Sequence, residues 1–244
     1  MRTYTMQGMQ TRSRSAVLVS LFSALLAGVL LISGCSKSED SAPLPDAATL
    51  LKQSAATTRA QQSVHIVLTV NGKVAKLTLT KLTGDLTQTP AVAAKGNASL
   101  SMGGMSVDAP FVVYGGDLYA SLTGGGTLSS FGPANKIYDI GAILNPDTGL
   151  ANVLSNMSDA KAVGRETING VNTIKVTGTV SQDAVDKLVP QLKITTTLPG
   201  TAWIADDDKH ELIQSQLEVT PGNNIQMTLS DWGKPVTVEK PADN

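Results

Sequence analysis

The sequence predicts an α+β domain built on one large antiparallel β-sheet, with about two or three helices on one face. Apolar and polar residues alternate over most of the chain after residue 64, and turn signals separate the alternating runs. A sheet of about ten strands twists too strongly to stay flat, so we expect a half-barrel. Its concave face then either packs shut or encloses a cavity.

The first expected element is a helix over residues 47–61, with Asp46 as its N-cap. A strand with apolar residues at every second position begins at Val64 and ends in a hairpin turn at Asn71-Gly72. This first half of the chain is therefore predicted to be an antiparallel meander. Its further strands are expected at about 76–86, 96–103, 106–114 and 117–122.

The second half begins with a helix, for which Asn145 and Pro146 supply an N-cap and a proline at the first helical position. This helix is expected to run to about Met157 and to cover the sheet. A second hairpin is predicted at Asn169-Gly170, and a short helix at 181–189. The last strands are expected near 201–206, 211–219 and 224–231.

The inward rows of these elements form a candidate cavity lining that is almost wholly aliphatic. A closed core explains these residues as well as a cavity does, since most apolar faces simply pack. The candidate residues are Val64, Ile66, Leu68, Ala98, Leu100, Met102, Ala109, Phe111, Val113, Leu150, Val153, Leu154 and Met157.

The single cysteine, Cys35, follows Leu31-Ile32-Ser33-Gly34 at the end of an apolar run. The run is preceded by arginines and by no acidic residue, which is typical of a bacterial lipoprotein signal with Cys35 as the lipidated residue. A short membrane-spanning helix or a plain buried cysteine are the alternatives. We therefore expect a signal peptide at 1–34, an acylated cysteine and flexible tether at 35–45, and one domain at 46–244. Met6 and Met9 are alternative starts.

Composition argues against several classes of function. The chain has 19 basic and 20 acidic residues, and loss of the leader would remove three arginines, so nucleic acid is not an expected partner. With Cys35 used as an anchor, no disulfide or cysteine metal site is expected. The histidines, His65 and His210, are expected on the outward side of a strand and beside a turn. No nucleophile motif accompanies them, so an enzyme is not predicted.

Two further groups of residues are weak candidates for a binding site. The acidic residues Asp206, Asp207, Asp208 and Glu211 lack the spacing of a calcium loop and are expected at a solvated hairpin tip. The run 124–126 consists of glycine but has neither a dinucleotide fingerprint nor a Walker lysine, so it is interpreted as a flexible loop or lid. No metal and no cofactor are expected.

Several blocks of sequence together resemble a known family. They are Leu-Asn-Pro-Asp-Thr-Gly-Leu-Ala-Asn-Val-Leu at 144–154, His-x-x-Leu-Thr-Val-Asn-Gly at 65–72, Phe-Gly-Pro-Ala at 131–134 and Gln-Met-Thr-Leu-Ser-Asp-Trp-Gly at 226–233. With shorter matches at 44–47, 137–139 and 203–204, the resemblance covers essentially the whole chain after the leader. The blocks are similar to those of the mycobacterial LppX/LprA/LprF/LprG lipoproteins.

The resemblance implies a half-barrel with an internal hydrophobic cavity, in preference to a closed core. It also implies a carrier of triacylglycerols, phosphatidylinositol mannosides, lipomannan and lipoarabinomannan that works with a major-facilitator membrane transporter. The expected location is the periplasmic face of the plasma membrane through a lipid anchor, with the cell wall or secretion as further possibilities. Recognition by Toll-like receptor 2 is implied as well. The alternative is a closed-core signalling or structural lipoprotein.

A carrier of this kind must enclose acyl chains, because exposure to water costs about 0.8 kcal/mol per methylene. The glycan headgroup would stay outside, so we expect a polar mouth. Selection is expected to rest on the number and length of the chains more than on the sugar.

Overall fold

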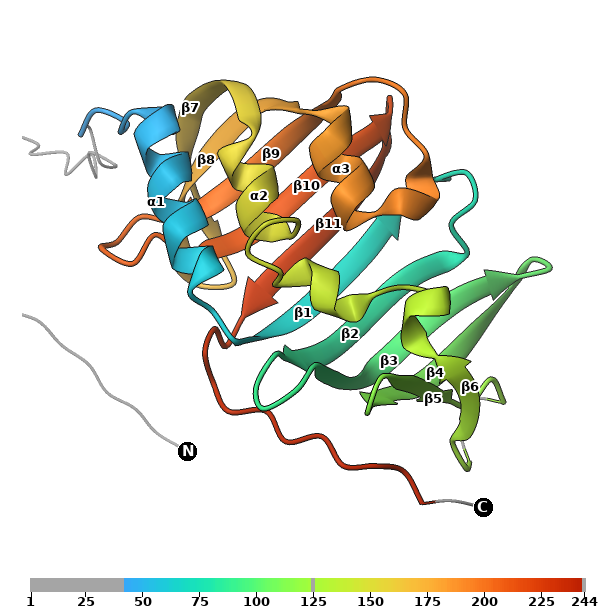
Figure 1. The fold of residues 1–244 in the computed structure, drawn as a ribbon. Coiled ribbons are helices and arrows are strands. Elements are labelled where there is room, and N and C mark those ends of the chain that lie inside the picture. Colours follow the sequence, from blue (N-terminus) through green and yellow to red (C-terminus); the bar gives the residue numbers. More distant parts are fainter. Residues whose placement is uncertain (1–41, 124–125, 243–244) are drawn as a thin grey trace, which may run out of the picture. The chain divides into compact units, whose positions relative to one another are not determined.

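The described part of the chain forms one antiparallel sheet of eleven strands with helices on one face (Figure 1). The computed structural model describes residues 42–123 and 126–242. The strands are β1 (Ser63–Asn71), β2 (Leu79–Thr87), β3 (Ala93–Met102), β4 (Met105–Tyr114), β5 (Asp117–Ala120), β6 (Ser129–Pro133), β7 (Met157–Ile168), β8 (Val171–Val180), β9 (Leu198–Ala205), β10 (Leu212–Thr220) and β11 (Asn223–Ser230). The helices are α1 (Ala47–Arg59), α2 (Leu150–Ser155) and α3 (Gln182–Leu188), with short 3-10 helices η1 (Ala134–Lys136), η2 (Ile140–Ile143) and η3 (Pro190–Leu192). The predicted α+β class and curved antiparallel sheet are confirmed.

The strand order is β6-β5-β4-β3-β2-β1-β11-β10-β9-β8-β7. Two meanders, β1–β6 and β7–β11, are thus joined by the pairing of the first strand with the last, in which Ile66 lies opposite Leu229 and Leu68 opposite Met227. Strands β6 and β7 lie at opposite edges of the sheet, so the chain between them must cross its full width. This crossing segment, residues 134–156, carries η1, η2 and α2 over the concave face (Figure 1).

Helices α1 and α3 lie on the same side of the sheet as α2 (Figure 1). The side chain of Asp46 caps α1 by accepting a hydrogen bond from the backbone N–H of Thr49 at 2.8 Å, which confirms the predicted N-cap. Leu50 and Leu51 of α1 are buried in the core. Helix α3 connects β8 to β9 and is capped by the hydroxyl of Ser181.

One main core holds the sheet and helices together, with residues from α1, α2, the crossing segment and most strands. Residues from Ala42 onward contain every described strand and this core, which are the features of a domain that folds by itself. Among residues 42–123 and 126–242, no helix is long and apolar enough to span a membrane.

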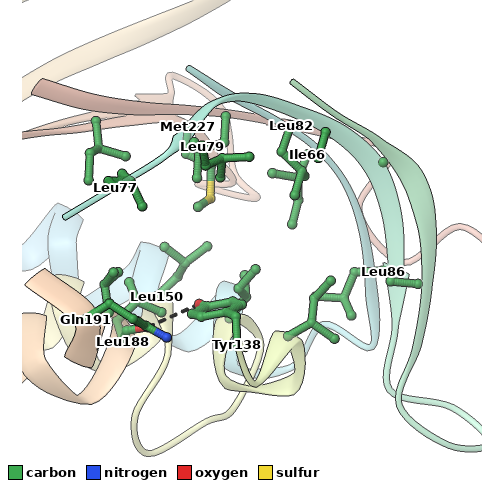
Figure 2. A pocket seen from close by; sticks show the side chains of 18 of the residues that line it. Ile66, Leu77, Leu79, Leu82, Leu86, Tyr138, Leu150, Leu188, Gln191 and Met227 are labelled. Atoms are coloured by element: carbon green, nitrogen blue, oxygen red, sulfur yellow. Dashed lines mark hydrogen bonds between the residues drawn. The ribbon is translucent and has the colours of Figure 1, made fainter. Parts of the chain in front are cut away.

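The sheet bends sharply at a pair of glycines. Gly84 of β2 and Gly96 of β3 lie directly opposite each other. A Cβ atom on Gly96 would come within 2.7 Å of the Gly84 Cα and 2.2 Å of the Thr83 carbonyl oxygen, so the backbones approach more closely than side chains allow. Figure 2 shows the consequence in β2, where Leu82 lies in one wall of a cavity and Leu86 has turned to its side.

Two predicted element starts are wrong. Strand β1 ends at Asn71, but β2 begins only at Leu79, because the apolar side chains of Val74 and Leu77 turn inward and lengthen the connection. The predicted helix from Asn145 starts only at Leu150. Asn145 does accept hydrogen bonds from the next turn, at 2.9 Å from the N–H of Asp147.

The interruption of that helix occurs at Gly149, which has ψ of −154°. A Cβ atom there would lie 2.4 Å from the carbonyl oxygen of Ile143, so the chain is packed against η2 and cannot continue a helix from 145. The other end also differs, because Met157 belongs to β7. Strand β6 was not predicted, since its residues are mostly exposed and do not alternate.

Replacing Gly96 by alanine is expected to lower the free energy of unfolding by about 1–3 kcal/mol, because the new methyl group must push β2 and β3 apart. Chemical denaturation measures this change. Gly164→Ala is the matched control, since a Cβ atom there meets nothing within 4 Å and its φ is not positive. Equal stability of the two variants would contradict the close approach at the bend.

Candidate ligand-binding cavity

A cavity of about 670 Å³ lies between the concave face of the sheet and the segments that cover it. Figure 2 shows its two walls: Ile66, Leu79, Leu82 and Met227 come from the sheet, and Tyr138, Leu150 and Leu188 face them from the other side. Most lining residues are apolar. The concave face is therefore not packed shut, and the closed-core interpretation of these residues does not describe this structure.

The structure places the candidate lining residues as follows. Val64 is fully buried in the main core and is not part of the cavity wall. Val64 lies near the beginning of β1, and Ile66 is the first residue of that strand that lines the cavity. The others lie in the wall: Ile66, Leu68, Ala98, Leu100, Met102, Ala109, Phe111, Val113, Leu150, Val153, Leu154 and Met157.

Sequence reasoning missed many wall residues, such as Leu79 and Leu82 of β2 and Leu188 of α3, and two further groups show why. The crossing segment contributes Ile137, Tyr138, Ile140 and Ile143, which lie in 3-10 helices and their flanks and so show no regular period. The last two strands contribute Leu212, Ser215, Gln216, Leu217, Ile225 and Met227. Alternation in β10 and β11 signalled an inward row, but only the pairing of β11 with β1 shows that this row continues the cavity wall.

Polar contacts tie the crossing segment to the region after α3. The phenol of Tyr138 donates to the carbonyl oxygen of Leu188 at 3.1 Å, and the amide Nε2 of Gln191 donates to the carbonyl oxygen of Ile137 at 3.0 Å. The amide Oε1 of Gln191 is buried and has no hydrogen-bond partner among the described residues. Burial, with a smaller effect of Asp139, raises the pKa of the Tyr138 phenol, so Tyr138 is a neutral donor.

The mouth of the cavity is marked by wall residues that are also exposed to solvent. They lie in the β1–β2 connection, at the end of β3, after β5, in β6 and after η1. The expectation of a polar mouth is wrong in one respect, because four of these residues are large and apolar. The exposed wall residues are Lys76, Thr78, Met102, Leu122, Phe131 and Ile137.

The candidates for other chemistry have structural roles. His65 lies on the face opposite Ile66, and its Nδ1 is 2.6 Å from the Oδ1 of Asp85. Asp206 pairs with Arg165 at 2.9 Å. Asp207 Oδ1 accepts the backbone N–H groups of Lys209 and His210, as expected for a hairpin tip.

Several sequence-based expectations fall outside the part of the chain that the structure describes. These are the signal peptide, the lipidated Cys35, most of the tether, and Gly124 and Gly125 of the glycine run. Within the described ranges there is no group of three or more histidine, cysteine or acidic side chains that could hold a metal ion.

Comparison with known proteins shows the family to which this chain belongs. A model of the LppX_LprAFG lipoprotein family matches residues 46–238. The chain belongs to this family. The lipoarabinomannan carrier protein LprG of Mycolicibacterium smegmatis is 58% identical over 237 residues, covering 96% of this chain and 100% of that protein.

Solved structures of the LppX_LprAFG family have the same architecture. LprF from Mycobacterium bovis superimposes with a TM-score of 0.75 at 35% identity, over 82% of this chain and 99% of that one. LppX from Mycobacterium tuberculosis gives a TM-score of 0.61 at 28% identity, over 79% of this chain and 97% of that one. The predicted relationship to these lipoproteins is confirmed, and with it the curved-sheet fold.

The buried phenol gives a prediction about alkaline pH. Tyrosine in an unfolded chain has a pKa of about 10, so raising the pH above this value ionises Tyr138 more readily in the unfolded than in the folded state. The neutral phenol makes its full contribution to the free energy of unfolding below pH 10. This contribution is lost as the pH rises further, by at most about 1.4 kcal/mol per pH unit. Tyr138→Phe should therefore lose less stability than wild type between pH 10 and 11, as measured by denaturation.

At neutral pH the same variant should be about 0.5–1.5 kcal/mol less stable, because it lacks the hydrogen bond to Leu188. Tyr114→Phe is the control, since Tyr114 is 40% exposed. If the stability of Tyr138→Phe and of wild type falls equally between pH 10 and 11, the phenol is accessible to solvent.

Proposed function

We propose that this protein is a non-enzymatic carrier that holds the acyl chains of multi-acylated lipids in its cavity. The observation that carries the proposal is the apolar space of about 670 Å³ beneath the crossing segment. It falls within the range of about 300–1,000 Å³ that is typical of sites for small ligands. An empty apolar space of this size destabilises a fold, so a resident ligand would account for its presence.

The chemistry of the wall supports lipid over other ligands. Its polar side chains are few, and the buried one with an unused acceptor, Gln191, lies beside the exposed Ile137 near the mouth. Enclosing an acyl chain saves about 0.8 kcal/mol per methylene, or on the order of 10 kcal/mol for a long chain. No bond has to be broken for this transfer.

The finer assignment rests on the family. The related LprG proteins are named as lipoarabinomannan carriers. We infer that triacylglycerols, phosphatidylinositol mannosides, lipomannan and lipoarabinomannan are the cargo, with the glycan outside the mouth. The protein would move them from the plasma membrane across the periplasm toward the outer envelope, in cooperation with a major-facilitator transporter.

The proposed acyl anchor at Cys35 would keep the carrier at the membrane. Cleavage after residue 34 would leave an acylated Cys35 and a tether that leads to the domain at 46–244. A polar, proline-containing tether behaves as a flexible spacer, so the domain would stay close to the membrane while it exchanges lipid. The carrier would then work at the periplasmic face of the plasma membrane.

Ala98→Trp tests the cavity. Ala98 is a small wall residue in the middle of β3, where it lies opposite Ala109 of β4, so an indole ring at this position would fill space that the ligand needs. We expect the variant to fold but to copurify with less than about a tenth of the wild-type lipid, in line with the loss of a buried chain. Native mass spectrometry and lipid extraction after purification from a mycobacterial host measure the difference.

Asn97→Trp is the matched control, because Asn97 is exposed and its neighbour in the strand faces the cavity. It should carry as much lipid as wild type. If Ala98→Trp copurifies with the same lipid as Asn97→Trp, the cavity is not where lipid is held.

Cys35→Ala tests the anchor. After a high-salt wash, the full-length variant should leave the membrane fraction while its lipid content stays unchanged, because the acyl anchor and the cavity are separate. Cell fractionation and the intact mass of the processed protein report the two quantities. A variant that stays with membranes in high salt although its leader has been removed would contradict the anchor, because high salt weakens binding that depends on the charge of the domain.

A further inference from the structure

The apolar surface of the described domain is concentrated at the mouth of the cavity. Most large hydrophobic side chains exposed in this part of the chain lie there, and the rest are Tyr114, Val163 and Val171. Met105, which is 70% exposed, pairs across the β3–β4 hairpin with Met102. Exposed apolar patches of this kind mark surfaces that meet another apolar phase. The mouth group is Met102, Met105, Leu122, Phe131 and Ile137.

Lysines surround these apolar side chains. Lys73 and Lys76 lie in the β1–β2 connection, Lys136 precedes Ile137, and Lys193 follows η3. The segments that border the mouth, residues 72–78, 101–106, 121–123, 126–137 and 189–197, contain no aspartate or glutamate. Within residues 42–123 and 126–242, none of these four lysines forms an ion pair. The mouth is thus cationic although the whole chain has a formal charge of −1.

A cluster of acidic residues lies at the other end of β9, although Glu218 of β10 lies at the mouth end. Strand β9 begins at Leu198, close to η3 and the mouth, and ends at Ala205. The turn that follows holds Asp206, Asp207 and Asp208. Along β9 the charge thus changes from the lysine-containing segment 189–197 to this acidic turn, which would favour approach of the mouth end to an anionic surface.

We propose that this mouth surface, defined as Lys76, Met102, Met105, Leu122, Phe131, Lys136, Ile137 and Lys193, docks on the headgroup region of an anionic lipid bilayer. Apolar side chains of the mouth would enter the boundary between headgroups and acyl chains, and the lysines would contact lipid phosphates. This goes beyond the carrier function, because a carrier could also receive its cargo from a protein.

Continuity with the cavity favours a bilayer as the occupant. Met102, Leu122, Phe131 and Ile137 belong both to the exposed surface and to the cavity wall. With these residues in the interface, the apolar path from bilayer to cavity is unbroken, so acyl chains need not cross water. Buried apolar area together with attraction of basic side chains to anionic lipids is what makes a surface bind at the membrane interface.

Binding of the domain from Ala42 to Asn244, which lacks the proposed anchor, to lipid vesicles tests this surface. Flotation with vesicles of equal parts phosphatidylglycerol and phosphatidylcholine is compared with flotation on phosphatidylcholine alone. We expect binding to the anionic vesicles only, weakened by salt. Lys136→Glu with Lys193→Glu should reduce vesicle affinity at least about tenfold, since each lysine near such a surface contributes about fivefold.

Two matched controls separate the mouth from general charge and hydrophobicity. Lys52→Glu with Lys209→Glu makes the same change of net charge on α1 and at the β9–β10 turn, and should bind like wild type. Met105→Ser should weaken binding about threefold or more, because Met105 is exposed at the mouth without forming part of the cavity wall. Val163→Ser, at the exposed β7 edge, should have no effect.

None of these altered residues lines the cavity, so lipid content by native mass spectrometry should be unchanged in all variants. A failure of docking is therefore distinguishable from a failure of the carrier function. Absence of vesicle binding, or equal loss in mouth and control variants, would overturn the proposal. So would a mouth variant that binds vesicles normally but no longer exchanges lipid with a membrane protein, because the surface would then be a protein interface.

Discussion

The pairing of β1 with β11 is the contact on which the rest of this structure depends. It joins two meanders into one sheet and sends β6 and β7 to opposite edges. The chain between those edges has no route except across a face of the sheet, and its apolar residues direct it to the concave one. Without this pairing there would be two small sheets, and the space between sheet and crossing segment would not exist.

The cavity then results from curvature and support acting together. Gly84 and Gly96 allow β2 and β3 to approach closely enough for the sheet to bend around the space. The crossing segment is held away from the sheet by its own packing against α1 and α3 and by the hydrogen bonds of Tyr138 and Gln191. Apolar faces in protein interiors usually pack closely, and here close packing is prevented by a covering layer whose segments are fixed against one another.

The same arrangement separates functions along the strands. One end carries the apolar and cationic mouth, and the other carries the acidic β9–β10 turn. Part of the main core, including Leu51, Val64 and Ile174, is buried without lining the cavity. A domain built in this way can open or fill its upper part without loss of the fold, which a carrier that alternates between loaded and empty states requires.

Local signals in the sequence determined the strands from β1 to β5 and β8 to β11 approximately, the capped start of α1, and the aliphatic character of the inward rows. These features depend on periodicity and on single residues such as Asp46, whose effects are local. Only the tertiary structure decided that Val64 belongs to the packed core while Ile66 faces a cavity, and that Tyr138 and Met227 complete its wall. Periodicity reports which face of an element is buried, but the pairing of β1 with β11 and the path of the crossing segment decide what that face is buried against.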